Sequence, residues 1–146
     1  MGSKSDYLEN KLIDHIFRDT AFTKPAALHV GLFTSTPSDT GGGTEVSGGS
    51  YARAQLNPDQ SNWAATQGGT GGPGASSGTG GATSNLAAIT FPSPTGNWGT
   101  VTSFGIFDNS SGGNLLYWGA LASNKTINNG DAAPVFAIGD LVITEG

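Results

Sequence analysis

After Pro25 the apolar residues of this chain recur at every second position in short segments, and this alternation constrains the fold more than any other feature. In residues 26–33, for example, Leu28, Val30 and Leu32 fall on one face of an extended chain. A period of two is typical of β-strands that bury one face. The strands expected on this basis are residues 26–33, 45–56, 85–91, 99–107, 114–121, 134–138 and 141–144.

Clusters of Gly, Asn, Asp and Pro separate these segments and favour turns. The expected turns lie at residues 92–97, 109–113, 128–131 and 139–140. Many short strands joined by such turns are typical of all-β architectures. We therefore predict a mainly β fold, an antiparallel β-sandwich or barrel of about seven strands, with one N-terminal amphipathic helix and long Gly-rich loops.

The expected helix covers residues 5–18, with Ser5 or Asp6 as its cap. Its apolar residues recur at spacings of three and four and form one stripe along the helix. Such a stripe packs either on the body of the same domain, which is the preferred interpretation, or on a neighbouring subunit. The residues of the stripe are Leu8, Leu12 and Ile16, together with Tyr7, Ile13 and Phe17.

The change of period at Pro25 suggests two parts, an N-terminal helical arm of residues 1–24 and a single β domain of residues 25–146. Glycine is concentrated in two loops of the second part. Residues 41–50 hold five Gly, and residues 67–81 hold eight. The second stretch has almost no apolar surface to offset its ordering entropy, so it is expected to be a flexible insertion in isolation.

Cations are scarce beyond the arm. Residues 25–146 hold two cations, Arg53 and Lys125, and seven carboxylates, so this part of the chain carries the whole net charge of −5. Binding to nucleic acid or to anionic lipid needs many cations, so neither partner is expected. No segment approaches the roughly 18 apolar residues of a membrane span, and residues 1–19 are too charged for a signal peptide. We therefore expect a soluble product made in the cytoplasm, with no membrane insertion.

No catalytic or metal-binding pattern is evident. The chain has no Cys, and His15 and His29 lie outside any metal-ligand spacing, so no cofactor is expected. Asp108, Asp131 and Asp140 could supply a pair of catalytic carboxylates. Each stands at an expected turn, however, where a short acid commonly caps the backbone.

Two Trp residues and one Arg are candidates for contacts. Trp63 lies in polar loop sequence, where contact with another subunit and packing are comparable alternatives. Trp98 follows a turn, and packing is preferred there over stacking on a sugar ring. Arg53 can pair with Glu45, pair with an acid of a neighbouring subunit, or remain exposed.

The order of motifs resembles the family of small tailed-bacteriophage virion proteins usually labelled phage tail fibre proteins. The more specific parts are residues 45–53 (EVSGGSYAR) and residues 98–108, which begin WGTV and end GIFD. Further parts of the resemblance are the helix residues 12–18 (LIDHIFR), residues 22–25 (FTKP) and 28–34 (LHVGLFT), and residues 89–92 (ITFP) and 113–119 (GNLLYWG). It covers nearly the whole chain apart from residues 67–81, and it implies a place in a virion and no catalytic residues.

The function expected from this resemblance is that of a non-enzymatic structural subunit of the virion, with a tail or fibre component preferred. A capsid-decorating (cement) protein is the first alternative, and a carbohydrate-binding module for the host surface is the second. The expected partners are other virion proteins and copies of itself, with a trimer as one option. The candidate assembly contacts are Leu8, Leu12, Ile16, Trp63, Trp98 and Arg53.

Overall fold

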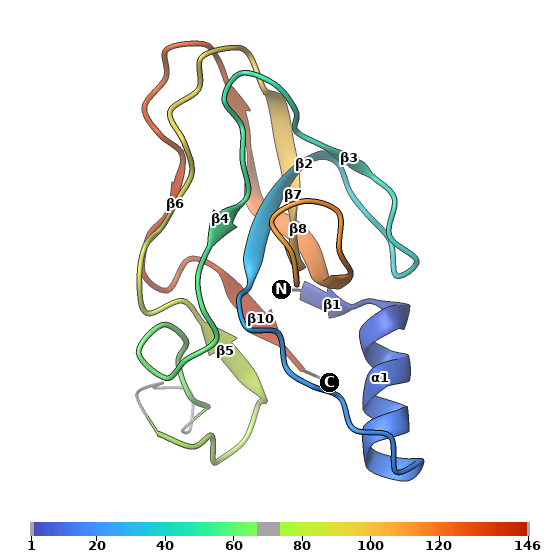
Figure 1. Cartoon of the computed structure of the whole chain (residues 1–146). Coiled ribbons are helices and arrows are strands. Elements are labelled where there is room, and N and C mark those ends of the chain that lie inside the picture. Colours follow the sequence, from blue (N-terminus) through green and yellow to red (C-terminus); the bar gives the residue numbers. More distant parts are fainter. Residues whose placement is uncertain (1, 67–73, 146) are drawn as a thin grey trace.

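The computed structural model describes residues 2–66 and 74–145, and it has a mainly β fold with antiparallel sheets (Figure 1). The largest sheet has the strand order β1-β8-β7-β2-β3, with β4 also paired to β2. Two small two-stranded sheets, β10-β5 and β6-β9, complete the fold. The elements are β1 (Gly2–Lys4), α1 (Asp6–Phe17), β2 (His29–Ser35), β3 (Thr44–Glu45), β4 (Ala54–Gln55), β5 (Ala82–Ser84), β6 (Ile89–Thr90), β7 (Gly99–Phe107), β8 (Leu115–Ile127), β9 (Val135–Phe136) and β10 (Val142–Thr144).

The core lies between one face of the large sheet and the small sheets that cover it. Val30, Leu32 and Ile106 project from the large sheet and pack with Ile89 of β6 and Ile143 of β10. The predicted antiparallel β fold with one helix is confirmed, and its two layers are sandwich-like. The large sheet has free edges, so the barrel alternative is wrong.

The β7–β8 hairpin is the longest paired unit. Strand β7 has the predicted bounds, whereas β8 continues to Ile127, six residues beyond the expected end at Leu121. Those extra residues are mostly exposed and polar, and they pair with the start of β7 through the register Gly99↔Ile127. A paired strand outside the core needs no apolar alternation, which is why the pattern missed this extension.

The predicted strand over residues 45–56 is wrong. Only β3 and β4, at its two ends, are strands. Gly48, Gly49 and Ser50 between them have φ angles of 75°, 54° and 62°. The left-handed region is incompatible with a continuous extended strand, so the chain turns here and leaves β2 between its two contacts.

Other strand predictions differ mainly at their ends. The strand expected over residues 85–91 is reduced to β6, because Asn85 is buried and bonds to loop backbone through its side chain. The strand expected over residues 134–138 is reduced to β9. Strands β1 and β5 were not expected. Strand β1 adds to the edge of β8 with the register Lys4↔Tyr117.

The predicted helix is confirmed as α1, and its cap is Ser5, whose hydroxyl oxygen accepts from the Leu8 amide at 3.3 Å. The preferred packing of the stripe on the body is confirmed only for the N-terminal part of the helix. Leu8 is 5% exposed and Leu12 is half-buried, but Ile16 is 65% and Phe17 is 79% exposed. The helix therefore touches the body near its N-terminal end and presents its C-terminal apolar residues to solvent.

The division into an arm of residues 1–24 and a β domain of residues 25–146 stays a prediction. Of the predicted Gly-rich insertion, residues 67–73 lie outside the described residues. The remainder, residues 74–81, has no helix or strand, and Gly74, Gly78, Gly80 and Gly81 have positive φ.

Candidate functional site: an apolar cavity and an arginine node

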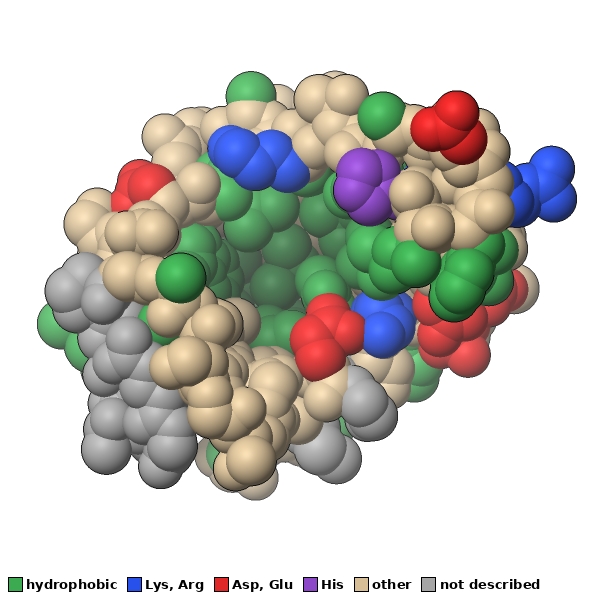
Figure 2. Space-filling view, turned by 90° about the horizontal axis from the view of Figure 1, so that it is seen from below, with side chains coloured by type: hydrophobic (Ala, Val, Ile, Leu, Met, Phe, Trp, Pro, Cys, Tyr) green, Lys and Arg blue, Asp and Glu red, His purple; other side chains and the backbone are tan. Residues whose placement is uncertain are grey.

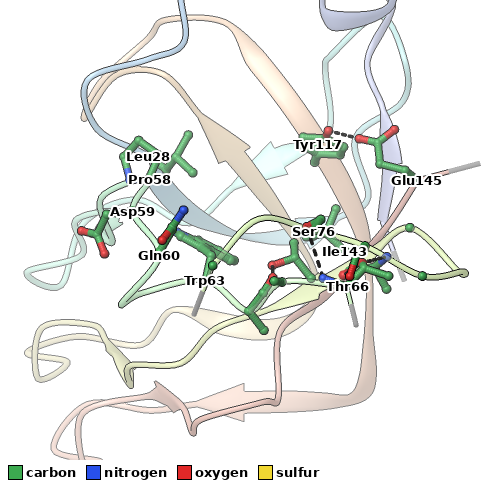
Figure 3. Close-up of a pocket in the computed structure, with 18 of the residues that line it drawn as sticks. Leu28, Pro58, Asp59, Gln60, Trp63, Thr66, Ser76, Tyr117, Ile143 and Glu145 are labelled. Carbon is green, nitrogen blue, oxygen red and sulfur yellow. Dashed lines mark hydrogen bonds between the residues drawn. The ribbon is translucent and has the colours of Figure 1, made fainter. Parts of the chain in front are cut away.

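A cavity of about 660 Å³ opens at the end of the molecule that lies at the bottom of Figure 1. Figure 2 shows it as a hollow with a hydrophobic floor and with acidic, basic and His side chains around it. Ile106 of β7 and Tyr117 of β8 contribute from the large sheet, and Ile143 contributes from β10. Leu28 and Trp63 add further apolar surface, so the site can hold an apolar group (Figure 3).

Trp63 is held in this cavity by the turn that precedes it. The Asp59 carboxylate accepts hydrogen bonds from the amides of Ser61 at 2.9 Å and Asn62 at 3.0 Å, and these bonds stabilise the turn. The hydrogen bond from the Ser61 hydroxyl is the main reason why the pKa of Asp59 lies below its ordinary value. Trp63 is half-buried against the core, and its Nε1 is buried without a hydrogen-bond partner among the described residues.

A polar cluster of Lys4, Tyr117 and Glu145 stands at the other side of the cavity. The Lys4 ammonium donates to a Glu145 oxygen at 2.7 Å, and the Tyr117 hydroxyl donates to the other oxygen (Figure 3). Burial raises the pKa of Glu145, but these two hydrogen bonds outweigh it, so the pKa lies below its ordinary value. The pKa of Lys4 is raised by its bond to Glu145, and that of Tyr117 is raised by burial.

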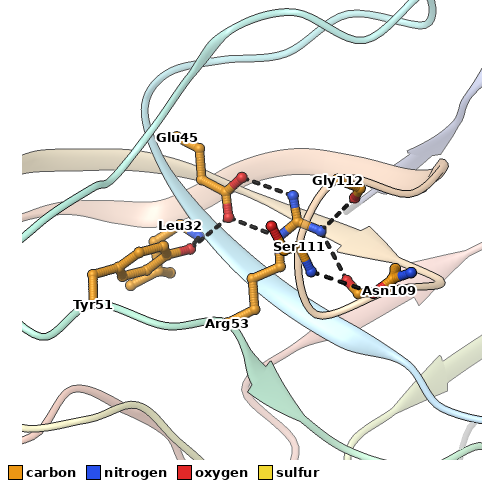
Figure 4. Close-up of polar contacts among 7 residues, drawn as sticks. All are labelled: Leu32, Glu45, Tyr51, Arg53, Asn109, Ser111 and Gly112. Carbon is orange, nitrogen blue, oxygen red and sulfur yellow. Dashed lines mark hydrogen bonds and ion pairs between the residues drawn. The ribbon is translucent and has the colours of Figure 1, made fainter.

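The second cluster, here called the arginine node, is centred on Arg53, whose side chain is only 7% exposed (Figure 4). Its Nε and Nη2 atoms donate to the two carboxylate oxygens of Glu45, each at 2.8 Å. Its Nη1 atom donates to the carbonyls of Asn109 and Gly112, also at 2.8 Å. The predicted pairing of Arg53 with Glu45 is therefore confirmed, and the exposed alternative is wrong.

Tyr51 completes the arginine node. Its hydroxyl donates to Glu45 Oε1 and accepts from the Leu32 amide, both at 2.9 Å. Burial raises the pKa of this phenol, so it remains a hydrogen-bond donor at neutral pH. The node thus links strands β2, β3 and β4 to the 109–113 turn through hydrogen bonds, so its role is structural.

Trp98 is 4% exposed, and its Nε1 donates to the Gly49 carbonyl at 2.9 Å. Its ring meets Tyr51 edge-on, with centroids 5.2 Å apart. The preferred packing of Trp98 is confirmed, and the ring offers no free face to a sugar. Whether any of the six candidate contacts reaches another subunit stays a prediction.

The three turn aspartates act as backbone caps, as the second interpretation expected. Asp108 accepts from the Asn114 amide at 2.7 Å. Asp131 and Asp140 accept from the amides three residues before them, at 2.7 Å and 3.2 Å. Across residues 2–66 and 74–145 no group of three or more His, Asp or Glu side chains could hold a metal ion. Within the same ranges no helix is long and apolar enough to cross a membrane.

Several residues of these sites were not expected from sequence. Tyr117, Glu145 and Lys4 lie far apart in the chain, and only the pairing of β1 with β8 brings Lys4 beside Tyr117. Phe107 was expected in a strand, but nothing local indicated that its ring would support Arg53.

The sequence model of one protein family, described as podophage GP4 fiber I protein gp80, matches residues 3–144. The chain belongs to this family. The match confirms the resemblance to phage tail fibre proteins, and membership makes the chain a fibre-type structural protein of a phage particle. A comparison with curated proteins gives no match.

Proposed function

We propose that the protein is a non-enzymatic, repeated surface subunit of the phage tail or tail fibre, which acts through contacts with copies of itself and with other virion proteins. The observation that carries this proposal is the match to the podophage fiber I family over residues 3–144. Synthesis in the host cytoplasm followed by incorporation into the particle belongs to the same proposal.

The chemistry of the polar residues supports a structural role. The three turn aspartates accept hydrogen bonds from backbone amides, and Arg53 uses four of its five N–H donors on Glu45 and two carbonyls. A virion subunit needs surfaces that become buried on assembly, and the apolar end of α1 is such a surface. The cavity is mainly apolar, which favours an apolar guest over the carbohydrate of the second alternative.

The test is to locate the protein in intact particles with a gold-labelled antibody, viewed by electron microscopy. We expect gold on the tail or its fibres in repeated positions. Gold on the head with bare tails would replace the tail assignment by the capsid-decorating alternative. Particles that carry no gold, in a preparation where denatured protein binds the antibody, would contradict the virion role.

A further inference from the structure

The turn over residues 128–131, which follows the end of β8, contains the one Asn-Gly sequence of the chain, Asn129–Gly130. The Asp131 amide closes the turn by donating to the Asn128 carbonyl at 3.1 Å, and the Asp131 carboxylate accepts from the Asn128 amide at 2.7 Å. All four residues of the turn are exposed. Water therefore has direct access to the Asn-Gly bond.

An Asn-Gly bond can react with itself and with water. The main-chain nitrogen of the glycine attacks Cγ of the asparagine and closes a five-membered succinimide ring. The attacking nitrogen loses its proton, and the side-chain nitrogen leaves as ammonia. Water then opens the ring at one of its two carbonyls, which gives aspartate or isoaspartate. Glycine favours the attack because it has no Cβ to hinder a close approach.

The two reacting groups of this turn are held differently. The side chain of Asn129 makes no hydrogen bond to any residue that the structure describes. The attacking nitrogen, by contrast, is engaged, because the Gly130 amide donates to the carbonyl of the buried Pro94 at 3.0 Å. The amide of Asn129 donates to Asn97 Oδ1 at 2.9 Å. Both bonds fix the turn to the 94–97 loop, and the two loops lie side by side at the top of Figure 1.

We infer that Asn129 is a site of spontaneous deamidation and that the bonds of the turn to Pro94 and Asn97 keep the reaction slow in the folded protein. Attack needs the Gly130 nitrogen to give up its proton and to face Cγ of Asn129. Its N–H points to Pro94 instead, so the turn must first open locally. This inference is independent of the proposed function, because it depends only on contacts within one chain.

The products would change the turn in two ways. Aspartate at position 129 adds one negative charge beside Asp131 to a chain whose net charge is already −5. Isoaspartate also adds a methylene group to the main chain between residues 129 and 130. The longer main chain displaces the Asp131 amide from the Asn128 carbonyl, so the turn loses the bond that closes it.

The first experiment compares the rate of deamidation in the folded protein with the rate in guanidinium chloride, at the same mildly alkaline pH. Lys125 is the last cation of the chain, so trypsin releases residues 126–146 as one peptide. Mass spectrometry of this peptide measures the modified fraction and assigns it to Asn128 or Asn129. We expect modification at Asn129, at least about tenfold faster in the denaturant, because unfolding removes both bonds to the 94–97 loop.

The second experiment alters the acceptor that holds the turn. Asn97→Ala removes the oxygen that accepts from the Asn129 amide, so deamidation of the folded protein should become about threefold faster or more. Asn97→Asp is the matched control, because it keeps an acceptor oxygen at the same position, and its rate should remain near that of the unaltered chain. Asn129→Gln should leave the peptide unmodified. Circular dichroism checks that each variant is folded.

Equal rates in the folded and the unfolded protein would overturn the protective role of the turn, as would an Asn97→Ala variant that reacts no faster than Asn97→Asp. Faster modification of another asparagine in the denaturant, or an unmodified peptide there, would overturn the assignment of the site to Asn129. None of these results bears on the position of the gold label on particles.

Discussion

The guanidinium of Arg53 lies over the ring of Phe107, with its central carbon 3.5 Å from the ring centroid. This contact sits on the face of the large sheet opposite the main core, where Phe107 packs with Phe33 and Leu115. The aromatic ring positions the guanidinium plane, and the Glu45 carboxylate then meets it edge-on with two hydrogen bonds. Stacking and bidentate pairing together require arginine, because a lysine ammonium offers neither a plane nor a fork.

Arg53→Lys should lower the free energy of unfolding by about 2–3 kcal/mol, because it removes the bidentate pair and the bonds to two carbonyls. Urea titration followed by tryptophan fluorescence measures the change. Arg18→Lys is the matched control, since the exposed pair of Arg18 with Asp14 contributes little, and its effect should stay below about 0.5 kcal/mol. Equal effects of the two substitutions would contradict a structural role for the arginine node.

Alanine substitutions at Gly48 and Gly49 can separate the energetic cost of backbone strain from the cost of a steric clash. Both have positive φ, but a Cβ on Gly49 would lie 2.9 Å from the Gly96 amide nitrogen, whereas one on Gly48 would meet nothing within 4 Å. Gly48→Ala should therefore cost about 1 kcal/mol from strain alone, and Gly49→Ala should cost at least about 1 kcal/mol more. Thermal unfolding of the two variants gives the comparison. An equal loss would show that the 48–50 turn does not pack against Gly96 in solution.

Asn85 is fully buried and bonds to four backbone groups through its side chain, of which the Phe136 carbonyl is the most distant at 3.4 Å. Its amide nitrogen donates to the carbonyls of Ala87 and Ala137, and its oxygen accepts from the Leu141 amide, each at 2.9 Å. Asn85→Leu keeps a similar size but leaves these groups without partners, so we expect a loss of about 3 kcal/mol or more in the free energy of unfolding. Asn124→Leu, at an exposed position of β8, should change it by less than about 0.5 kcal/mol. Similar effects at the two positions would contradict the bonds assigned to Asn85.

His29 should make stability depend on pH. Burial lowers its pKa below the ordinary 6.5, the charge of Arg53 lowers it further, and Asp108 partly opposes both. The unfolded chain therefore binds a proton at His29 more readily than the folded protein does. The free energy of unfolding falls as the pH drops from about 7 toward the folded pKa. Below that value no further loss comes from His29.

The measurement for His29 is urea unfolding at about pH 7.5 and about pH 5.5, a window that leaves Glu145 ionised because its pKa lies below 4.5. We expect His29→Gln to lose less stability over this window than the unaltered chain. Carboxylates titrate alike in both proteins, so the difference isolates His29. The same pH dependence in both proteins would refute the assignment.

Sequence reasoning was most successful where structure is local. The bounds of β7 and the cap of α1 follow from period and capping chemistry within a few residues. The 45–56 segment was not predictable in this way, because the left-handed backbone at residues 48–50 interrupts an otherwise extended pattern. A helical period predicts an apolar stripe but not what the stripe packs against, so the exposure of Ile16 and Phe17 could not be predicted.

The candidate sites were predictable only in part for a related reason. Arg53 and Glu45 lie eight residues apart, so their pairing could be expected from charge alone. The carbonyls of Asn109 and Gly112 belong to a distant turn, and only the register of β2 with β7 brings it close. The cavity combines Leu28, Ile106 and Ile143 from three separate parts of the chain, and Trp63 was the only local signal for it.

Lys4 and Tyr117 both donate hydrogen bonds to Glu145, and these contacts have a consequence for protein engineering. Residues 4 and 145 both lie beside Tyr117 of β8, so a short peptide could join the two ends of the chain. The backbone could then be opened before Gly42, because the loop there is exposed and a Cβ on Gly42 would meet nothing within 4 Å. Such a circular permutant should retain the native sheet, because strand pairing and side-chain contacts hold the ends in place. The new termini would lie at the Gly42 loop and not at the apolar cavity. A protein fused to these termini would leave the cavity end of the molecule free.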